Sequence, residues 1–220
     1  MTTEFTAAVD SSSPDDLEAL LDLVEETLVP QGMSLDDLVR TRLVTSTRAG
    51  RDAASKVRFR RLSGPARCAT SSYIEPGAFR GSDGVRLDVW AVPGAGAAKI
   101  AVEYDPPQPP CRYVAVGQQV FLSGVTSFAE TFDVQIAEIA ARLADNLAHA
   151  VARLGRPVTP VRLTPWVHRS LTAAQLKDLP ARLGLPDLAP AIHRCDGYSA
   201  PGKLIEVEVD AAAEGGSPVG

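Results

Sequence analysis

One arginine stands at the entrance to a predicted strand, within residues 64–68, which read Gly-Pro-Ala-Arg-Cys. Arginine keeps its charge at any ordinary pH, and its planar fork of donors fits a carboxylate at two points. If Arg67 lies in a cleft, it would therefore hold an acidic substrate. The alternative is a surface arginine in a turn, because Gly64 and Pro65 are typical turn residues.

Asp88 is the second residue that could do chemistry, because it lies on the otherwise apolar predicted strand of residues 85–92. A carboxylate there is either a hydrogen-bonded structural acid or a group aimed into a cleft, where it could transfer protons. The residues alone leave both interpretations open.

Charge and cysteine content exclude several classes of protein. The 220 residues carry a formal net charge of −5, and the only dense basic run, Arg58, Arg60 and Arg61, is read as a solvated edge and not as a nucleic-acid surface. The three cysteines contain no CxxC pair, so we expect neither a zinc site nor a disulfide framework. No stretch approaches the apolar length of a membrane span, and the N-terminus does not resemble a signal peptide, so we expect a cytoplasmic protein.

The elements that must position these residues follow from hydrophobic periodicity and turn signals. The helix of residues 14–28 begins with a hydroxyl cap, a proline and two acids at 13–16. The helix with the clearest pattern is that of residues 133–154, where apolar residues recur at the spacing of one helix face. Helices are predicted for residues 14–28, 52–61, 133–154 and 171–183. Strands are predicted for 39–45, a stretch ending at 73, 85–92, 99–104, 113–116, 120–123, 161–167, 190–198 and 203–209.

The two halves of the chain share one order of elements, which indicates an internal repeat. The segment 105–110 (DPPQPP) cannot join a central sheet, so it separates the halves. We expect a first module at 1–104 with a reduced opening hairpin, a linker at 105–110, a second module at 111–211 and a disordered tail at 212–220. An apolar helix face of this width must cover a sheet, so each module is predicted to be a two-layer α+β sandwich.

The motifs of both halves resemble the YjgF/Rid family of reactive-intermediate (enamine/imine) deaminases. In the first half these are residues 32–41 (GMSLDDLVRT), 65–68 (PARC) and 87–89 (LDV); in the second, residues 116–124 (VGQQVFLSG), Gln135 and 204–209 (LIEVEV). The resemblance covers roughly residues 15–92 and 111–211. It implies a chorismate-mutase-like fold, clefts between neighbouring subunits of a homo-oligomer, usually a trimer, and neither a metal nor an organic cofactor.

Site residues follow from the resemblance, position by position. Arg67 matches the arginine that grips a substrate carboxylate, Glu206 matches the closing-strand glutamate that handles a proton or a water, and Ser123-Gly124 matches the strand end that completes the pocket. Asp88 takes the glutamate position in the first copy. We add Cys68, Tyr113, His193 and Arg194 as candidates for substrate binding.

The second copy departs from the family pattern. It reads Pro190-Ala191-Ile192 where the family has Pro-Ala-Arg, although His193 and Arg194 follow at once. Alternation along a strand lets only one of these two polar residues face the cleft. We therefore expect at most one conventional site per chain, built from both copies or across a chain interface.

The expected function is that of a Rid-like enzyme acting on a small carboxylate-bearing imine or enamine, by hydrolytic deamination or in a biosynthetic tailoring step. Arg67 would hold the carboxylate, and Glu206 or Asp88 would move the proton. One alternative is a hydrolase resembling the chorismatases, two-copy relatives that act on chorismate. Another is a non-catalytic ligand-binding or assembly partner. The expected partner is a small carboxylate, with no nucleic acid and no membrane.

Overall fold

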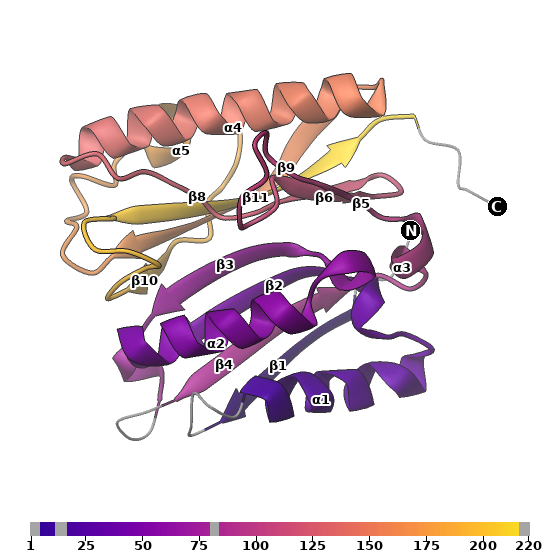
Figure 1. The fold of residues 1–220 in the computed structure, drawn as a ribbon. Coiled ribbons are helices and arrows are strands. Elements are labelled where there is room, and N and C mark those ends of the chain that lie inside the picture. Colours follow the sequence, from indigo (N-terminus) through magenta and orange to yellow (C-terminus); the bar gives the residue numbers. More distant parts are fainter. Residues whose placement is uncertain (1–4, 12–16, 80–83, 216–220) are drawn as a thin grey trace.

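Two β-sheets lie face to face, and helices cover their outer sides (Figure 1). The computed structural model describes residues 5–11, 17–79 and 84–215. The predicted helix start at 13–16, the breakers at 81–83 and the tail residues 216–220 lie outside the described residues. The fold is α+β, as predicted. No helix in the described ranges combines the length and apolar character that crossing a membrane would need.

The first sheet has four strands in the order β1-β4-β2-β3. The strands are β1 Phe5–Ser11, β2 Leu38–Thr45, β3 Ala69–Ile74 and β4 Val85–Ala91. Only β2 and β3 run parallel, and helix α2, Arg48–Arg61, connects them. Helix α1, Leu17–Leu28, buries four of its leucines and Val24 in one core with the outward residues of β4, because both patterns have one apolar face.

The second sheet has seven strands, with the path β10-β9-β11-β7-β6-β5 and β8 paired to β11. The strands are β5 Ile100–Val102, β6 Tyr113–Val116, β7 Gln119–Leu122, β8 Val125–Thr126, β9 Val158–His168, β10 His193–Cys195 and β11 Ile205–Ala213. Helix α4, Phe132–Leu154, covers this sheet. The Thr131 hydroxyl caps its first turn, and Gly155, at φ 65°, ends it in the left-handed conformation that glycine favours.

The two sheets repeat one topology. The order β3-β2-β4-β1 in the first half corresponds to β10-β9-β11-β7 in the second, with a parallel pair at the same edge. Helices α1 and α4 precede the equivalent strands β2 and β9, while α2 and α5, Leu179–Arg182, lie between the strands of each parallel pair. The predicted tandem repeat, including the equivalence of the two long helices, is confirmed.

Several predicted boundaries were wrong, each for a local reason. The helix predicted at 171–183 is reduced to α5, because Asp178 has a positive φ and Pro180 follows it. The strand predicted at 190–198 is reduced to β10, between Pro190 and Gly197. Helix α2 begins four residues earlier than predicted, at Arg48, where the Thr47 hydroxyl caps it.

The connection between the halves also differs from the prediction. A short helix, α3, Ala95–Ala98, begins within the glycine-containing turn of residues 93–96, where no helix was predicted. Strand β5, predicted to close the first module, pairs antiparallel with β6 of the second sheet. At the other end, β11 continues to Ala213, two residues into the predicted tail. The remaining short elements are 3-10 turns at Val29–Gln31, Leu35–Asp37, Gly64–Ala66 and Pro76–Ala78.

The inner faces of the sheets form the contact between the two halves. Two apolar clusters cross it, one around Val39 and Phe121 and the other around Tyr73 and Trp166. The outer edge of β3 also bonds directly to the second half, since the Thr70 carbonyl accepts from the Gly124 N–H at 3.0 Å. This edge contact positions the functional site.

Candidate functional site

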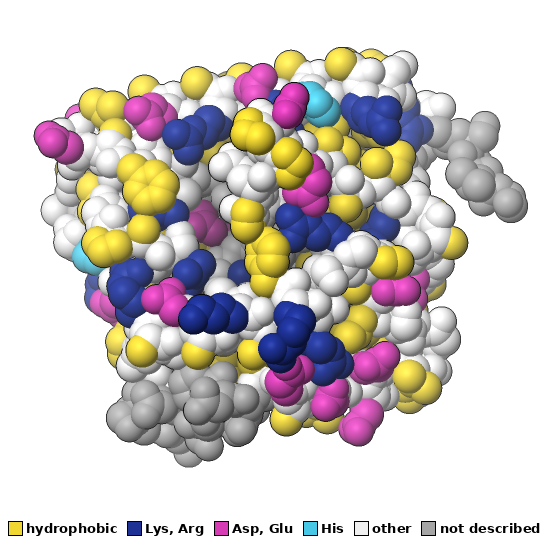
Figure 2. Space-filling view, in the orientation of Figure 1, with side chains coloured by type: hydrophobic (Ala, Val, Ile, Leu, Met, Phe, Trp, Pro, Cys, Tyr) yellow, Lys and Arg dark blue, Asp and Glu magenta, His cyan; other side chains and the backbone are white. Residues whose placement is uncertain are grey.

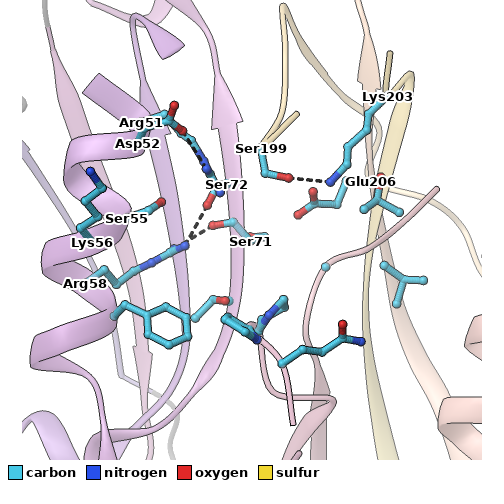
Figure 3. A pocket seen from close by; sticks show the side chains of 18 of the residues that line it. Arg51, Asp52, Ser55, Lys56, Arg58, Ser71, Ser72, Ser199, Lys203 and Glu206 are labelled. Atoms are coloured by element: carbon cyan, nitrogen blue, oxygen red, sulfur yellow. Dashed lines mark hydrogen bonds and ion pairs between the residues drawn. The ribbon is translucent and has the colours of Figure 1, made fainter. Parts of the chain in front are cut away.

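A cavity of about 1300 Å³ opens where α2 and β3 of the first half face β8 and β11 of the second. Figure 3 shows side chains from both halves converging on it, and Figure 2 shows Lys and Arg side chains around a hollow in this face of the molecule. Its volume exceeds that of most small-molecule sites. The family resemblance implied clefts between neighbouring subunits, whereas this cavity lies between the two copies of one chain.

Glu206 lies on β11 in the wall of this cavity and is only 5% exposed. Burial raises the pKa of its carboxyl to about 7, although the nearby Lys203 acts in the opposite direction. A carboxyl with this pKa holds its proton near neutral pH for a large fraction of the time. Glu206 can therefore act as a general acid and then, ionised, as a base.

Gly124 permits the position of Glu206. A Cβ atom built on Gly124 would lie 2.1 Å from Glu206 Oε1, far inside van der Waals contact. Any larger residue at 124 would push the carboxyl away. The glycine predicted at the strand end is thus required by close approach, and not by an unusual backbone angle.

Arg58, on α2, faces Glu206 from the other half of the chain. It is buried, and its guanidinium donates to the Ser71 carbonyl and to Ser72 Oγ, both at 2.8 Å. Burial lowers the pKa of Arg58 to about 10, which still leaves it charged at neutral pH. Within the described ranges, no carboxylate lies at ion-pair distance from this guanidinium. A buried cation without a counter-ion attracts an anionic ligand.

The charged residues of the lining are mostly basic. Arg51, Lys56, Arg58, Arg60, Arg142 and Lys203 line the cavity, against the two acids Asp52 and Glu206. Two buried polar atoms in the wall, Arg51 Nε and Ser55 Oγ, have no hydrogen-bond partner in the described part of the chain. Both the charge and these atoms suit a ligand that carries acceptor oxygens.

Two predicted site residues lie in this cavity, Glu206 and Gly124, and a third is adjacent. Ser123 Oγ accepts from the backbone N–H of Thr70 at 3.2 Å, so it joins the two halves at the cavity edge. These three residues come from the second copy, and the first copy contributes α2 and β3 to the cavity wall.

Arg67, the predicted carboxylate clamp, is not among the residues that line the cavity. Its guanidinium makes a two-point ion pair with Glu103, at 2.8 and 3.0 Å, and stacks over the Phe59 ring at 5.0 Å. Because Phe59 lines the cavity, Arg67 supports the wall from behind. The two N–H groups that Arg67 donates to Glu103 are therefore not free to bind a substrate carboxylate.

Asp88 and His193 belong to a different cluster. Asp88 pairs with Arg42 and Arg86 on the inner face of the first sheet. His193 stacks on Trp166 with the ring centroids 4.7 Å apart, and burial lowers its pKa. Neither lines the cavity with Glu206.

The remaining candidates have structural contacts. Cys68 is buried beside Thr41. Tyr113 is in the core of the second half, with its hydroxyl 2.9 Å from His149 Nδ1. Arg194 donates to the carbonyls of Leu171 and Arg169. None of the three lines the cavity.

Sequence reasoning missed the cations of the cavity, Arg58 above all. The run at 58–61 was taken as a solvated edge, whereas Arg58 is 5% exposed. One signal was present: Arg51 and Arg58 are seven residues apart, which places both on one face of a helix. No pattern in the sequence indicated Lys203.

Comparisons with known proteins identify the fold. Neither the protein-family models nor the curated proteins give a match to this sequence. The structure is similar to a crystal structure of a chorismatase, with a TM-score of 0.69 and 16% identity, over 96% of this chain and 76% of that one.

Other solved structures match about half of this chain. A YjgF/YER057c/UK114-family protein from Mycobacterium tuberculosis matches 52% of this chain and 99% of its own, with a TM-score of 0.43 and 21% identity. A YjgF-family protein from Neisseria meningitidis matches 53% of this chain and 96% of its own, with a TM-score of 0.38 and 17% identity. The similarity to the chorismatase structure shows that the chain has this fold.

Proposed function

We propose that this protein is a hydrolase of carboxylate-bearing enol ethers or enamines, with a chorismatase-like substrate as the best candidate. The observation that carries the proposal is Glu206, a buried carboxyl with a pKa of about 7 in a cavity whose charged lining residues are mainly cations. Enol ethers and enamines share the unit CH₂=C(X)–COO⁻, where X is oxygen or nitrogen. Both are hydrolysed after a proton is added to the CH₂ carbon.

Glu206 would supply this proton. In its acid form it donates to the CH₂ carbon, which forms a C–H bond and leaves an oxocarbenium or iminium ion at the neighbouring carbon. Water adds to that carbon, and the ionised Glu206 takes up a proton from the water. Loss of the alcohol or amine then gives a 2-oxo acid. Neither a redox step nor a second substrate is needed.

Arg58 would hold the substrate carboxylate. Its guanidinium is fixed by Ser71 and Ser72, so the cation is held in place before the ligand arrives. The fork geometry suits a carboxylate, and burial strengthens the attraction by excluding water. Arg58 thus takes the role that the resemblance had suggested for Arg67.

The volume of the cavity favours the larger substrate class. At about 1300 Å³ it is much larger than a three-carbon enamine needs, whereas a ring with an enolpyruvyl side chain and a second carboxylate would use more of it. The smaller Rid-type imines and enamines remain the second candidate, because the same acid and the same cation serve them.

The test is release of a 2-oxo acid from chorismate, followed with lactate dehydrogenase and NADH, in parallel with freshly generated 2-aminoacrylate. We expect turnover of chorismate that falls as the pH rises above about 7, where Glu206 loses its proton. Glu206→Gln should abolish turnover. Glu103→Gln is the matched control, since it removes a carboxylate that pairs with Arg67 outside the cavity.

Two outcomes would overturn the proposal: Glu206→Gln as active as the natural chain, or no turnover of either substrate. Tight binding of chorismate without turnover would instead support the non-catalytic alternative.

A further inference from the structure

Lys203 occupies an unusual position for a lysine. It follows Gly202 at the turn that leads to β11, lines the cavity and is only 6% exposed. In Figure 3 its amino group points towards the carboxyl of Glu206. The other lysines of the chain, Lys56, Lys99 and Lys177, are exposed or half-buried.

The amino group of Lys203 lacks the counter-ion that a buried ammonium normally has. Its Nζ donates to Ser199 Oγ at 2.5 Å and lies 4.5 Å from the centre of the Phe128 ring. Within the described ranges no carboxylate lies at ion-pair distance from it. Neither a hydroxyl nor a ring compensates fully for the loss of water around a charge.

Burial and three neighbouring arginines favour the neutral form of Lys203. Glu206 attracts a positive charge there and is the strongest of the charges, whereas Arg51, Arg142 and Arg48 repel one. Burial, the largest effect, lowers the pKa of Lys203 in the same direction as these arginines. A desolvated lysine beside other cations, with a carboxyl that can exchange protons next to it, is the arrangement of imine-forming lysines.

We propose that Lys203 is a nucleophile that forms an imine with 2-oxo acids bound in the cavity between the two halves. The inference rests on the proposed function only for the carboxylate-binding character of this cavity. It adds a covalent step that hydrolysis of an enol ether does not require. The ligand class follows from the chemistry: the cations hold the carboxylate, and the amine reaches the adjacent carbonyl carbon.

The atoms balance without another reactant. The Lys203 nitrogen forms a bond to the carbonyl carbon, and the carbonyl oxygen becomes the hydroxyl of a carbinolamine as a proton moves to it from nitrogen. Glu206, in its acid form, then protonates this hydroxyl, which leaves as water while the C=N bond forms. The nitrogen proton returns to Glu206. Amine and 2-oxo acid thus give imine and water, and nothing is oxidised.

The test traps this imine. The full-length protein is incubated with pyruvate, reduced with borohydride and examined by intact mass and peptide mapping. We expect one reduced pyruvate adduct per chain, on Lys203. Lys203→Arg, which keeps the charge, and Lys203→Met, which keeps the length, should both lose the adduct while their thermal unfolding shows a folded protein.

Matched controls separate position from burial. Lys56→Arg removes an exposed lysine of the same cavity, and Lys99→Arg removes a half-buried lysine outside it, whose pKa burial also lowers. Both variants should keep the adduct. A second readout is exchange of the methyl protons of pyruvate in D₂O, which an imine permits through its enamine and which Lys203→Arg should abolish.

The inference is overturned by the absence of any adduct, by an adduct that persists in Lys203→Arg, or by one mapped to another lysine. Its failure differs from failure of the proposed function. Turnover of chorismate without trapping would remove only the imine, and trapping without turnover of enol ethers or enamines would remove only the hydrolase.

Discussion

Arg67, the predicted carboxylate clamp, and Arg58, predicted to be part of a solvated edge, differ in the groups that they already bind. Arg67 is engaged at two points by Glu103, whereas Arg58 bonds only to a carbonyl and a hydroxyl. A guanidinium that pairs with an acid of its own chain has less to offer a ligand. Arg67 therefore supports the wall of the cavity, whereas Arg58 can bind a ligand.

Arg58→Lys should lower kcat/KM about 10- to 100-fold, because a lysine loses one of the two directed bonds to a carboxylate. Arg67→Lys should change kcat/KM less than about threefold, since Arg67 does not line the cavity. Steady-state kinetics on the same substrate compare the two variants. The reverse ranking would return the clamp to Arg67.

Gly124→Ala should lower kcat about 100-fold, the cost of displacing a reacting group by about an ångström. The added methyl would collide with Glu206 Oε1. Gly197→Ala is the control, because its nearest neighbour, 3.3 Å away, is the flexible end of Ile74. Equal kcat values for the two variants would contradict the close-contact argument.

Strand β11 carries three acids, Glu206, Glu208 and Asp210, on one face because alternate residues of a strand point the same way. Different surroundings give Glu206 and Glu208 different pKa values. Glu208 accepts from Arg42, Ser71 and Tyr73, and although burial alone would raise its pKa, the bonds and charges of Arg42 and Arg40 lower it to about 2. Glu206, two residues away, has only burial as its dominant influence.

Glu206→Gln should become more stable relative to the natural chain as the pH rises. The folded-state pKa of Glu206 is raised to about 7, so the natural chain loses stability as the pH rises from about 4.5 to 7. The glutamine variant avoids this loss, which amounts to at most about 3 kcal/mol. Urea unfolding at pH 4.5, 6 and 8 measures it, and a difference that does not change with pH would contradict the raised pKa.

Glu208→Gln should show the opposite dependence. Its lowered folded-state pKa stabilises the natural chain above about pH 4.5, and this contribution is lost as the pH falls towards 2. The variant should therefore be less stable by about 3 kcal/mol at neutral pH, with a deficit that shrinks in acid. Urea unfolding at neutral pH and at pH values from about 4.5 down to about 2.5 measures it. A deficit that grows in acid would show that Glu208 is not held as a charge.

The two halves are joined by one continuous chain of opposite charges. It runs from Arg86 through Asp88, Arg42, Glu208, Arg40 and Asp210 to Arg162. Arg42 also lies between the rings of Trp90 and Trp166, one from each sheet, at 4.7 and 5.3 Å. A partly buried network of this kind holds the relative position of the sheets, which in turn sets the width of the cavity.

We expect the two halves to unfold together. Trp90→Phe and Trp166→Phe leave one tryptophan in each case, so that fluorescence reports the second or the first sheet alone. Both variants should show urea transitions with the same midpoint as circular dichroism of the same sample. Separate midpoints for the two probes would show that the modules are independent.

The trimer expected from the family resemblance remains a prediction. Measurement of the molecular mass in solution would test it.

The sequence by itself determined the local elements and their repetition. Helix α4, strands β2 and β4 and the hairpin of β6 and β7 follow from apolar periodicity, caps and turns, which depend on neighbours a few residues apart. The order of elements was enough to reveal two copies. The family resemblance named Glu206 and Gly124 as candidates for one site, and the structure places them in contact.

Only the tertiary structure decided which side chains meet and which are buried. In the structure Arg67 pairs with Glu103, Arg58 and Lys203 are buried, and β5 pairs with a strand of the second sheet. The physical reason is that pairing partners and desolvation come from segments far apart in the chain. The spacing of residues along one element fixes the direction of a side chain relative to its neighbours, but it does not specify which surface from the other half will cover that side chain.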